Sequence, residues 1–269
     1  MYTLPMGASS AGRGMETKEV FDSYKNAEIG YMEISSRPNE YEVYDWDVVK
    51  EACKLSGVKV WSLHTPFHPD THNIANPDKK IRDFTIECYT DLFDKAASLG
   101  AKYVIVHPSS EPISDEERPL AIEHSKESLR ILAERARKAG ITIAVENLPR
   151  TCLGNTVEEL MDIISVDDDI VICFDVNHLL KQTHKHFVSV AGSKIKTLHI
   201  SDYDFIDERH LLPGEGKIDW KEILTLLEGA GYDGVFMYEV SLQADDSNGK
   251  KYPISHAKEN YTNVMERKI

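Results

Sequence analysis

The sequence predicts a single (β/α)8 TIM barrel of the α/β class that spans residues 1–269, on three observations. Eight short runs of apolar and β-branched residues alternate with longer amphipathic stretches along the chain. Glycines close most of these stretches shortly before the next apolar run, as expected where a helix leads into a strand. No Pro/Ser-rich linker divides the 269 residues, and one such barrel typically needs ~250.

The eight apolar runs are the predicted strands. In chain order they cover 2–5, 29–35, 58–65, 102–108, 141–148, 170–176, 195–201 and 235–241. Their nearly continuous hydrophobicity suits parallel strands that are covered on both faces. The first run is the weakest signal, because it is short and lies at the chain end.

The amphipathic stretches are the predicted helices. They cover 46–57, 77–101, 121–140, 156–164, 219–234 and 255–269. Asp219 and the pair Asn155–Thr156 carry the side-chain oxygens that cap helix starts. An open, doubly wound sheet is the main alternative fold. No GxGxxG or GxxxxGK[ST] motif follows the first strand, which argues against the nucleotide-binding form of that alternative.

The composition limits the classes of function. A formal net charge of −14 opposes a large electrostatic surface for nucleic acid or an anionic membrane. The four cysteines, at positions 53, 88, 152 and 173, form no CxxC pair, so neither a zinc ribbon nor a dithiol motif is predicted. The first twenty residues hold no apolar run of signal-peptide or membrane-span length. We therefore expect a cytoplasmic chain with reduced thiols and no membrane or nucleic-acid partner.

Acidic residues and histidines gather where the predicted strands end. Strands two to eight end at or near Glu33, His64, His107, Glu146, Asp175, His199 and Glu239. The C-terminal strand ends of a barrel converge on one mouth, so these side chains should lie close together. No strand end offers a Lys or Arg to balance the acids, and the absence of Lys also opposes a Schiff-base aldolase.

This charge pattern predicts a divalent metal at the C-terminal mouth, because carboxylates packed together are costly unless a cation neutralises them. The strongest donor set is Glu146, Asp175, His199 and Glu239. Three carboxylates and one imidazole suit Mn2+, Co2+, Mg2+ or Zn2+ better than copper or an iron–sulfur cluster.

Five motifs at strand ends resemble the xylose-isomerase-like sugar phosphate isomerase/epimerase superfamily. They are AVENLPR (144–150), FDVNH (174–178), HISDYD (199–204), HLLPGEGKIDW (210–220) and YEVS (238–241). Resemblance to the ketohexose epimerases of that superfamily implies that the four-residue donor set binds the metal and that Glu146 and Glu239 are also the acid/base pair. It further implies that His178 contacts substrate oxygens, with Arg209 the nearest candidate for a family arginine after the seventh strand.

The motifs also resemble the endonuclease IV branch, which uses three zinc ions. In that pattern His64 and His107 join Glu146 at one metal, and Asp175, His199 and Glu239 form the second. The third would be held by His178, Glu208 and His210, although that branch has Asp where this chain has Glu208. The loops after the second, third and fourth strands are rich in acids, which favours a sugar substrate over duplex DNA.

We therefore expect a metal-dependent sugar or sugar phosphate isomerase/epimerase that transfers a proton next to a carbonyl through an enediolate. Further candidates for substrate contact are Glu33 and Trp61, with Phe67 and Trp220 as additional apolar surface. The GEG turn at 214–216 offers backbone N–H groups that could hold a phosphate. The alternatives are an endonuclease IV-like zinc phosphodiesterase, or a lyase or deglycosidase of keto-sugars with the same metal site. The sugar, the number of metals and any homo-oligomer stay open.

Overall fold

Eight parallel strands form the centre of the computed structural model, which describes residues 2–11, 17–35, 37–240 and 252–269. The strands are β1 (Met6–Ser9), β2 (Tyr31–Ser35), β3 (Lys59–His64), β4 (Tyr103–Val106), β5 (Thr142–Glu146), β6 (Val171–Asp175), β7 (Ile195–His199) and β8 (Phe236–Tyr238). Each strand pairs with its sequence neighbour from β1 to β7, and β1 also pairs with β8. A parallel bridge between Ile200 and Tyr238 brings β7 against β8. The predicted TIM barrel is confirmed.

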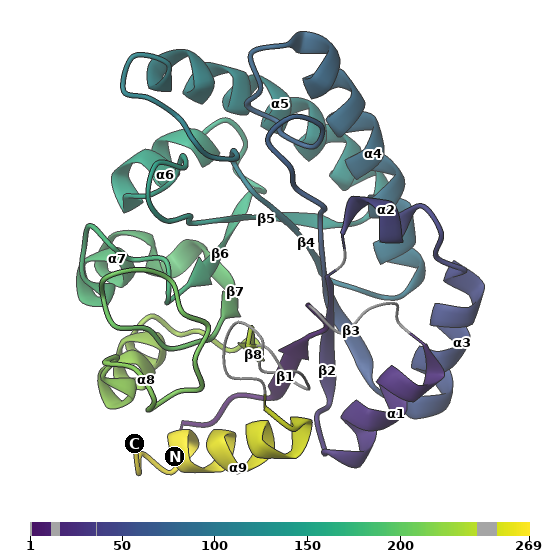
Figure 1. The fold of residues 1–269 in the computed structure, drawn as a ribbon, viewed down its shortest axis with the longest axis vertical. Helices are drawn as coiled ribbons and strands as arrows, with labels where there is room; N and C mark the ends of the chain where they lie inside the picture. The colour runs from purple at the N-terminus through teal and green to yellow at the C-terminus, as the bar shows by residue number, and fades with distance from the viewer. Residues whose placement is uncertain (1, 12–16, 36, 241–251) are drawn as a thin grey trace.

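Helices surround the strands (Figure 1). They are α1 (Lys18–Asn26), α2 (Pro38–Tyr41), α3 (Trp46–Ser56), α4 (Lys79–Ser98), α5 (Arg118–Ala139), α6 (Val157–Ile164), α7 (His184–Ala191), α8 (Trp220–Gly229) and α9 (Ile254–Met265), with a short 3-10 turn, η1 (Gly192–Lys194). The six predicted helices are all present. Three others, α1, α2 and α7, were not predicted. The four residues of α2 form only about one turn.

The predicted first strand is wrong in position, since β1 covers Met6–Ser9 rather than 2–5. The sequence MGAS lacks the β-branched and aromatic residues that mark strands. Close packing explains the small residues: a Cβ at Gly7 would lie 2.6 Å from a methyl group of Val235 and 2.8 Å from one of Met237. β1 is therefore placed by what surrounds it in the barrel and not by its own propensity.

Helix caps follow the predicted chemistry. The Thr156 hydroxyl accepts a hydrogen bond from the Glu159 N–H, and Asp219 accepts one from Glu222 at the start of α8. Gly57 and Gly140 end α3 and α5 in the left-handed conformation, with φ of 78° and 75°. Each of these two glycines ends its helix two residues before the next strand begins, at Lys59 and Thr142.

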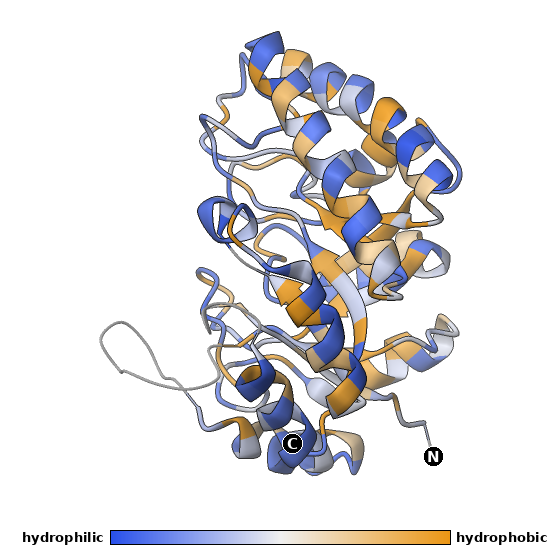
Figure 2. Cartoon of the chain, turned by 90° about the vertical axis from the view of Figure 1, so that its right-hand side faces the viewer, coloured by the Kyte–Doolittle hydropathy of each residue, from blue (hydrophilic) through white to orange (hydrophobic). Residues whose placement is uncertain are grey.

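The outer helices carry both hydrophilic and apolar residues (Figure 2). In α6 the buried residues are Val157, Leu160, Ile163 and Ile164, the spacing of one helical face. Strands β4 to β7 are almost entirely buried, so each is covered by helices outside and by barrel side chains inside. Within the described ranges, no helix has the length and apolarity needed to cross a bilayer.

Candidate metal centre

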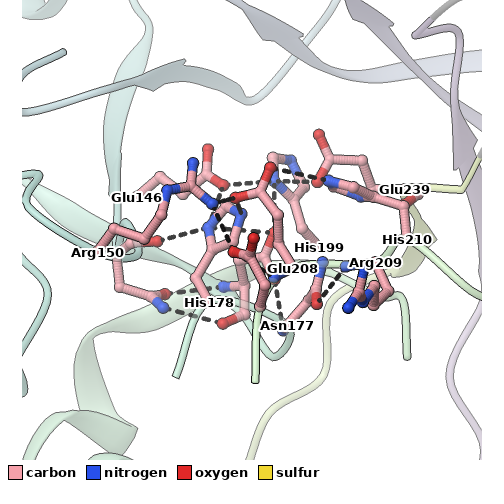
Figure 3. A network of polar contacts seen from close by, with 12 residues as sticks. Glu146, Arg150, Asn177, His178, His199, Glu208, Arg209, His210 and Glu239 are labelled. Carbon is pink, nitrogen blue, oxygen red and sulfur yellow. Dashed lines mark hydrogen bonds and ion pairs between the residues drawn. The ribbon is translucent and has the colours of Figure 1, made fainter. Parts of the chain in front are cut away.

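Glu146, the last residue of β5, belongs to a network of polar contacts with side chains from other strand ends (Figure 3). Its side chain is 1% exposed. Its Oε1 atom lies 3.1 Å from Nδ1 of His199, and its Oε2 atom lies 3.3 Å from Nε2 of His64 and 3.2 Å from Nε2 of His107. One carboxylate therefore contacts imidazoles from three other strand ends.

Glu146, Asp175, His199 and Glu239 each offer a ligand atom, and these atoms all lie within 4.8 Å of one another. Nδ1 of His199 is 3.3 Å from Glu239 Oε2 and 4.0 Å from Asp175 Oδ2. Both of these carboxylate oxygens are buried without a hydrogen-bond partner. An unsatisfied buried carboxylate oxygen is costly, and a bound cation would satisfy both. The donor set fits a divalent ion on this ground as well as by its chemistry.

Two further donor groups flank this one. His64, His107 and Glu146 form the first, and His178, Glu208 and His210 form the second, each again within 4.8 Å. The groups are adjacent, because Nδ1 of His178 lies 3.4 Å from both Glu146 Oε1 and Asp175 Oδ2. The structure thus brings together every residue that the sequence nominated as a metal donor.

The buried carboxylates of the cluster differ in their pKa shifts. Burial raises the pKa of Asp175 to about 7, and the charges of Glu239 and Glu146 add to this effect against the opposing influence of His178. Burial also opposes the charged form of Glu146, yet the His199 and His107 imidazoles hold the pKa of Glu146 well below its usual range. A divalent ion would favour ionised carboxylates throughout the cluster.

Side chains behind the cluster hold the donors in place. Nε2 of His199 lies 3.1 Å from both oxygens of Glu33, whose Oε2 also accepts a hydrogen bond from the Ser62 hydroxyl. The side-chain amide of Asn147 donates to the Asp175 carbonyl and accepts from the Asp175 N–H. Glu33 is fully buried beneath His199, so the structure corrects the expectation that it contacts substrate.

Trp61 is not brought to the mouth. Its indole packs against Val235 and Met237, next to Tyr31 and Tyr103, which begin β2 and β4. These residues lie at the strand starts, so Trp61 fills the opposite end of the barrel, and its predicted substrate contact is corrected. The sequence showed that Trp61 belongs to a strand but not at which depth its bulk would fit.

The other nominated contacts divide between the pocket, the core and the surface. Phe67 lines the pocket, is 51% exposed and stacks on His107 with a ring separation of 4.2 Å. Trp220 is buried in the core. Arg209 pairs with Asp204 at 3.1 Å, is about half exposed and does not line the pocket, so nothing in its contacts supports a role at the substrate.

Arg150 reaches the mouth although the sequence did not nominate it. It lies in the AVENLPR motif, four residues after Glu146, and adopts φ = 50°. Its guanidinium donates hydrogen bonds to Glu111, Asp207 and Glu208. Glu208, a loop residue, therefore has an arginine partner although no strand end supplies one. The left-handed backbone of Arg150 turns its side chain back over the mouth. The hydrophobic pattern of the sequence does not predict the conformation of such a loop residue.

A pocket of about 410 Å3 lies above the metal donors, and Glu146 and Glu239 form part of its wall. Its polar wall includes Glu146, Glu239, His178 and Ser110, while Leu148, Pro149, Val240 and Phe67 provide apolar surface. Asp175 and His199 are absent from the lining and lie beneath it. A pocket of this size and mixture suits a small polar molecule.

The family model described as xylose isomerase-like TIM barrel matches residues 21–258. The chain belongs to this family. Its relatives include D-psicose 3-epimerase of Ruminiclostridium cellulolyticum, 26% identical over 230 residues that cover 80% of this chain and 75% of that enzyme. The crystal structure of a D-tagatose 3-epimerase-like protein has a TM-score of 0.84 at 26% identity and covers 98% of this chain and 97% of that one.

Two further relatives are not sugar epimerases by name. An uncharacterised protein of Methanocaldococcus jannaschii is 32% identical over 191 residues, or 66% of this chain, and the match spans only 63% of that protein's length. A probable endonuclease 4 of Mycoplasmoides gallisepticum is 26% identical over 182 residues, which cover 61% of this chain and 59% of that protein. The resemblance to both branches noted in the sequence is confirmed at the level of the family.

Proposed function

We propose that this chain is a divalent-metal-dependent isomerase or epimerase of carbohydrates that transfers a proton at a carbon next to a carbonyl. One observation carries the proposal. Glu146 and Glu239 both line the pocket and approach Nδ1 of His199 to 3.1 and 3.3 Å from different strands. The sugar epimerases among the relatives support the same class of reaction.

Glu146, Asp175, His199 and Glu239 would hold the ion. When bound, the ion would supply Lewis-acid stabilisation of the negative charge that develops on the substrate's carbonyl oxygen. The Asn177 N–H donates to Oδ1 of Asp175, and Glu33 contacts the far nitrogen of His199, so these two donors have little freedom to turn away. Such support is typical of metal ligands.

The two glutamates are placed for opposite tasks. Glu146 ends β5 and Glu239 follows β8, and the barrel separates these strands by β6 and β7 on one side. Figure 3 shows the two side chains entering the cluster from its two sides. One carboxylate can remove the proton from one face of the substrate, and the other can return a proton to the opposite face, which inverts the carbon.

The proposal is tested by isotope exchange. The Mn2+-loaded protein is incubated in heavy water with free ketoses, their phosphates and keto-glycosides, and the products are followed by NMR. We expect deuterium at the carbon next to the carbonyl in an epimerised or isomerised ketose. Elimination or cleavage of a keto-glycoside without epimerisation would instead assign the site to a lyase or deglycosidase.

Zinc-dependent hydrolysis of phosphodiesters is the second candidate. The donor groups His64–His107–Glu146 and His178–Glu208–His210, on either side of the central set, favour it, and the probable endonuclease 4 among the relatives supports it. Elemental analysis with hydrolysis of bis(p-nitrophenyl) phosphate decides between the two. Three zinc ions per chain together with hydrolysis would replace the isomerase by this candidate.

A further inference from the structure

We propose that the site accepts uncharged sugars or polyols and excludes their phosphate esters, an inference that rests on the function proposed above. A phosphate group needs hydrogen-bond donors or cations close to the pocket. In this barrel, the protein's own carboxylates already bind the hydrogen-bond donors of the loop after β7 and the guanidinium of Arg150.

The Asp202 carboxylate accepts hydrogen bonds from donors in the segment that follows β7. Its Oδ1 accepts hydrogen bonds from the N–H groups of Tyr203 and Ile218, at 2.8 and 3.1 Å. Its Oδ2 accepts from the Gly214 N–H at 2.8 Å and from Nε1 of Trp220 at 2.9 Å. The side chain is fully buried. A carboxylate thus lies where four donors converge.

The loop after the seventh strand contributes to the phosphate site of many barrels. Here Asp202 and its donors lie in that region but do not line the pocket. The GEG turn was expected to offer its N–H groups there. Instead the turn is closed over Asp202, because a Cβ at Gly216 would lie only 2.2 Å from Asp202 Oδ1. The start of α8 is also capped internally, since Asp219 accepts from the Glu222 N–H. An incoming phosphate would have to displace an internal anion.

Arg150 is the one Arg or Lys that lines the pocket within the described part of the chain. Its Nε and Nη2 donate to Glu111 Oε1 at 2.8 and 2.6 Å. Its Nη1 donates to Asp207 and Glu208, at 2.9 Å each. Three carboxylates therefore share one guanidinium, and the arrangement as a whole carries negative charge.

The charge balance of the pocket follows from these contacts. Four carboxylates line it, those of Glu111, Glu146, Glu208 and Glu239, and Asp207 and Asp175 lie directly beside them. One divalent ion, the Arg150 guanidinium and a protonated His210, which lies 3.8 Å from Glu208, supply four positive charges, fewer than the six carboxylates. Like charges at close range cost free energy, so a phosphorylated substrate would be repelled.

An uncharged polyhydroxy compound meets the opposite situation. Its hydroxyl groups can donate hydrogen bonds to the carboxylate oxygens of Glu111 and Asp207. The Ser110 hydroxyl also lines the pocket and is buried without a partner, so it is available to a substrate oxygen. We infer that the loops after β4 and β7 select hydroxyl groups and not phosphate at the end of the substrate remote from the donors.

The test removes two of the three carboxylates that pair with Arg150. Glu111→Gln with Asp207→Asn leaves Glu208, a candidate metal donor, as the remaining carboxylate partner of the guanidinium. Asp167→Asn with Asp169→Asn is the matched control, because these two acids occupy Arg137 in the same way at the far end of the barrel. Binding of D-fructose, D-fructose 6-phosphate and inorganic phosphate to each Mn2+-loaded protein is measured by calorimetry, at low and at high salt.

We expect D-fructose to bind the wild type and both phosphates to bind at least ~10-fold more weakly. The Glu111/Asp207 variant should gain on the order of tenfold in affinity for inorganic phosphate, and added salt should reduce this gain. The Asp167/Asp169 variant should gain nothing. If the double variant unfolds, Asp207→Asn alone serves, since the Asp207 side chain is about half exposed.

Phosphate binding to the wild type as tight as that of D-fructose would overturn the inference. So would an unchanged phosphate affinity in a folded Glu111/Asp207 variant. If no sugar binds but the variant still gains phosphate affinity, the exclusion of anions stands and the proposed sugar isomerase fails.

Discussion

Glu33 and His199 form a fully buried pair in which both carboxylate oxygens lie 3.1 Å from Nε2 of the imidazole. The pairing leaves Nδ1 facing Glu146 and Glu239. A carboxylate on the far nitrogen fixes the ring's orientation and makes the other nitrogen a better ligand. Glu33 therefore acts on the proposed metal through His199.

The first prediction concerns this pair. Glu33→Gln should lower the affinity for Mn2+ by about 10- to 100-fold, because the amide binds the imidazole N–H less strongly than a carboxylate does. Calorimetric titration of the metal-free protein measures the effect. Ser62→Ala, which removes only the hydrogen bond to Glu33, should have a smaller effect. Equal Mn2+ affinity in Glu33→Gln and wild type would show that Glu33 has no part in metal binding.

The second prediction separates the two proposed bases. Glu146→Gln and Glu239→Gln should each reduce turnover by ~10²- to 10⁴-fold. At least one of them should still exchange the substrate proton with solvent, because the remaining carboxylate can remove it. NMR in heavy water follows exchange and inversion separately. A wild-type product without solvent deuterium would point to a shielded one-base transfer or a hydride shift.

The third prediction concerns the number of bound ions. We expect about one tightly bound divalent ion per chain, lost with activity on chelation. Asp175→Asn should abolish binding, whereas His107→Ala should leave the stoichiometry unchanged. Added Mn2+ at a hundred times its Kd should stabilise the wild type by about 2.7 kcal/mol. Two or three ions in the wild type, with one of them lost in the His107 variant, would favour the multinuclear alternative.

The fourth prediction concerns the loop after β7. Asp202→Asn replaces an acceptor oxygen by an NH2 group that faces donors, so we expect a loss of about 2–4 kcal/mol in the free energy of unfolding. Urea denaturation measures the loss. Asp83→Asn is the control, because its partner Lys79 is exposed on α4 and such pairs contribute about 1 kcal/mol or less. Similar values for the two variants would mean that Asp202 does not organise the loop.

The fifth prediction concerns nucleic acid. The net charge of −14 and the carboxylates around Arg150 oppose phosphate backbones. We expect no incision of duplex DNA that contains an abasic site, and binding no tighter than ~10⁻⁴ to 10⁻⁶ M. Gel assays with the zinc-loaded protein test this expectation. Incision at nanomolar protein would assign the chain to the repair branch.

The sequence was informative where barrel geometry leaves no choice. Parallel strands bring their C-terminal ends to one mouth, so Glu146, Asp175, His199 and Glu239 could be grouped without knowing any loop. The same rule does not say what lies above or below a donor. Glu33 was therefore nominated for the substrate, although it sits behind His199.

The sequence pattern could not predict the contacts of loop residues or the position of a side chain along the barrel axis. Arg150 contacts Glu111, Asp207 and Glu208, which lie 39, 57 and 58 positions away, and no periodicity links them. Trp61 lies in β3 as predicted, but its position at the end of the barrel opposite the mouth depends on how it packs against Val235 and Met237. β1 was misplaced because its packing requires small residues in place of typical strand formers.

The four central metal donors lie in the second half of the chain, whereas the pocket wall is drawn from both halves. The central donors Glu146, Asp175, His199 and Glu239 all follow from strands β5 to β8. Much of the pocket wall, including Phe67, Ser110 and Glu111, follows strands β3 and β4. Exchange of the loops after β3 and β4 would therefore alter one part of the pocket wall and leave the four central donors in place. The loops after β5 and β7, which carry Arg150 and Asp207, would have to change with them for a full change of selectivity.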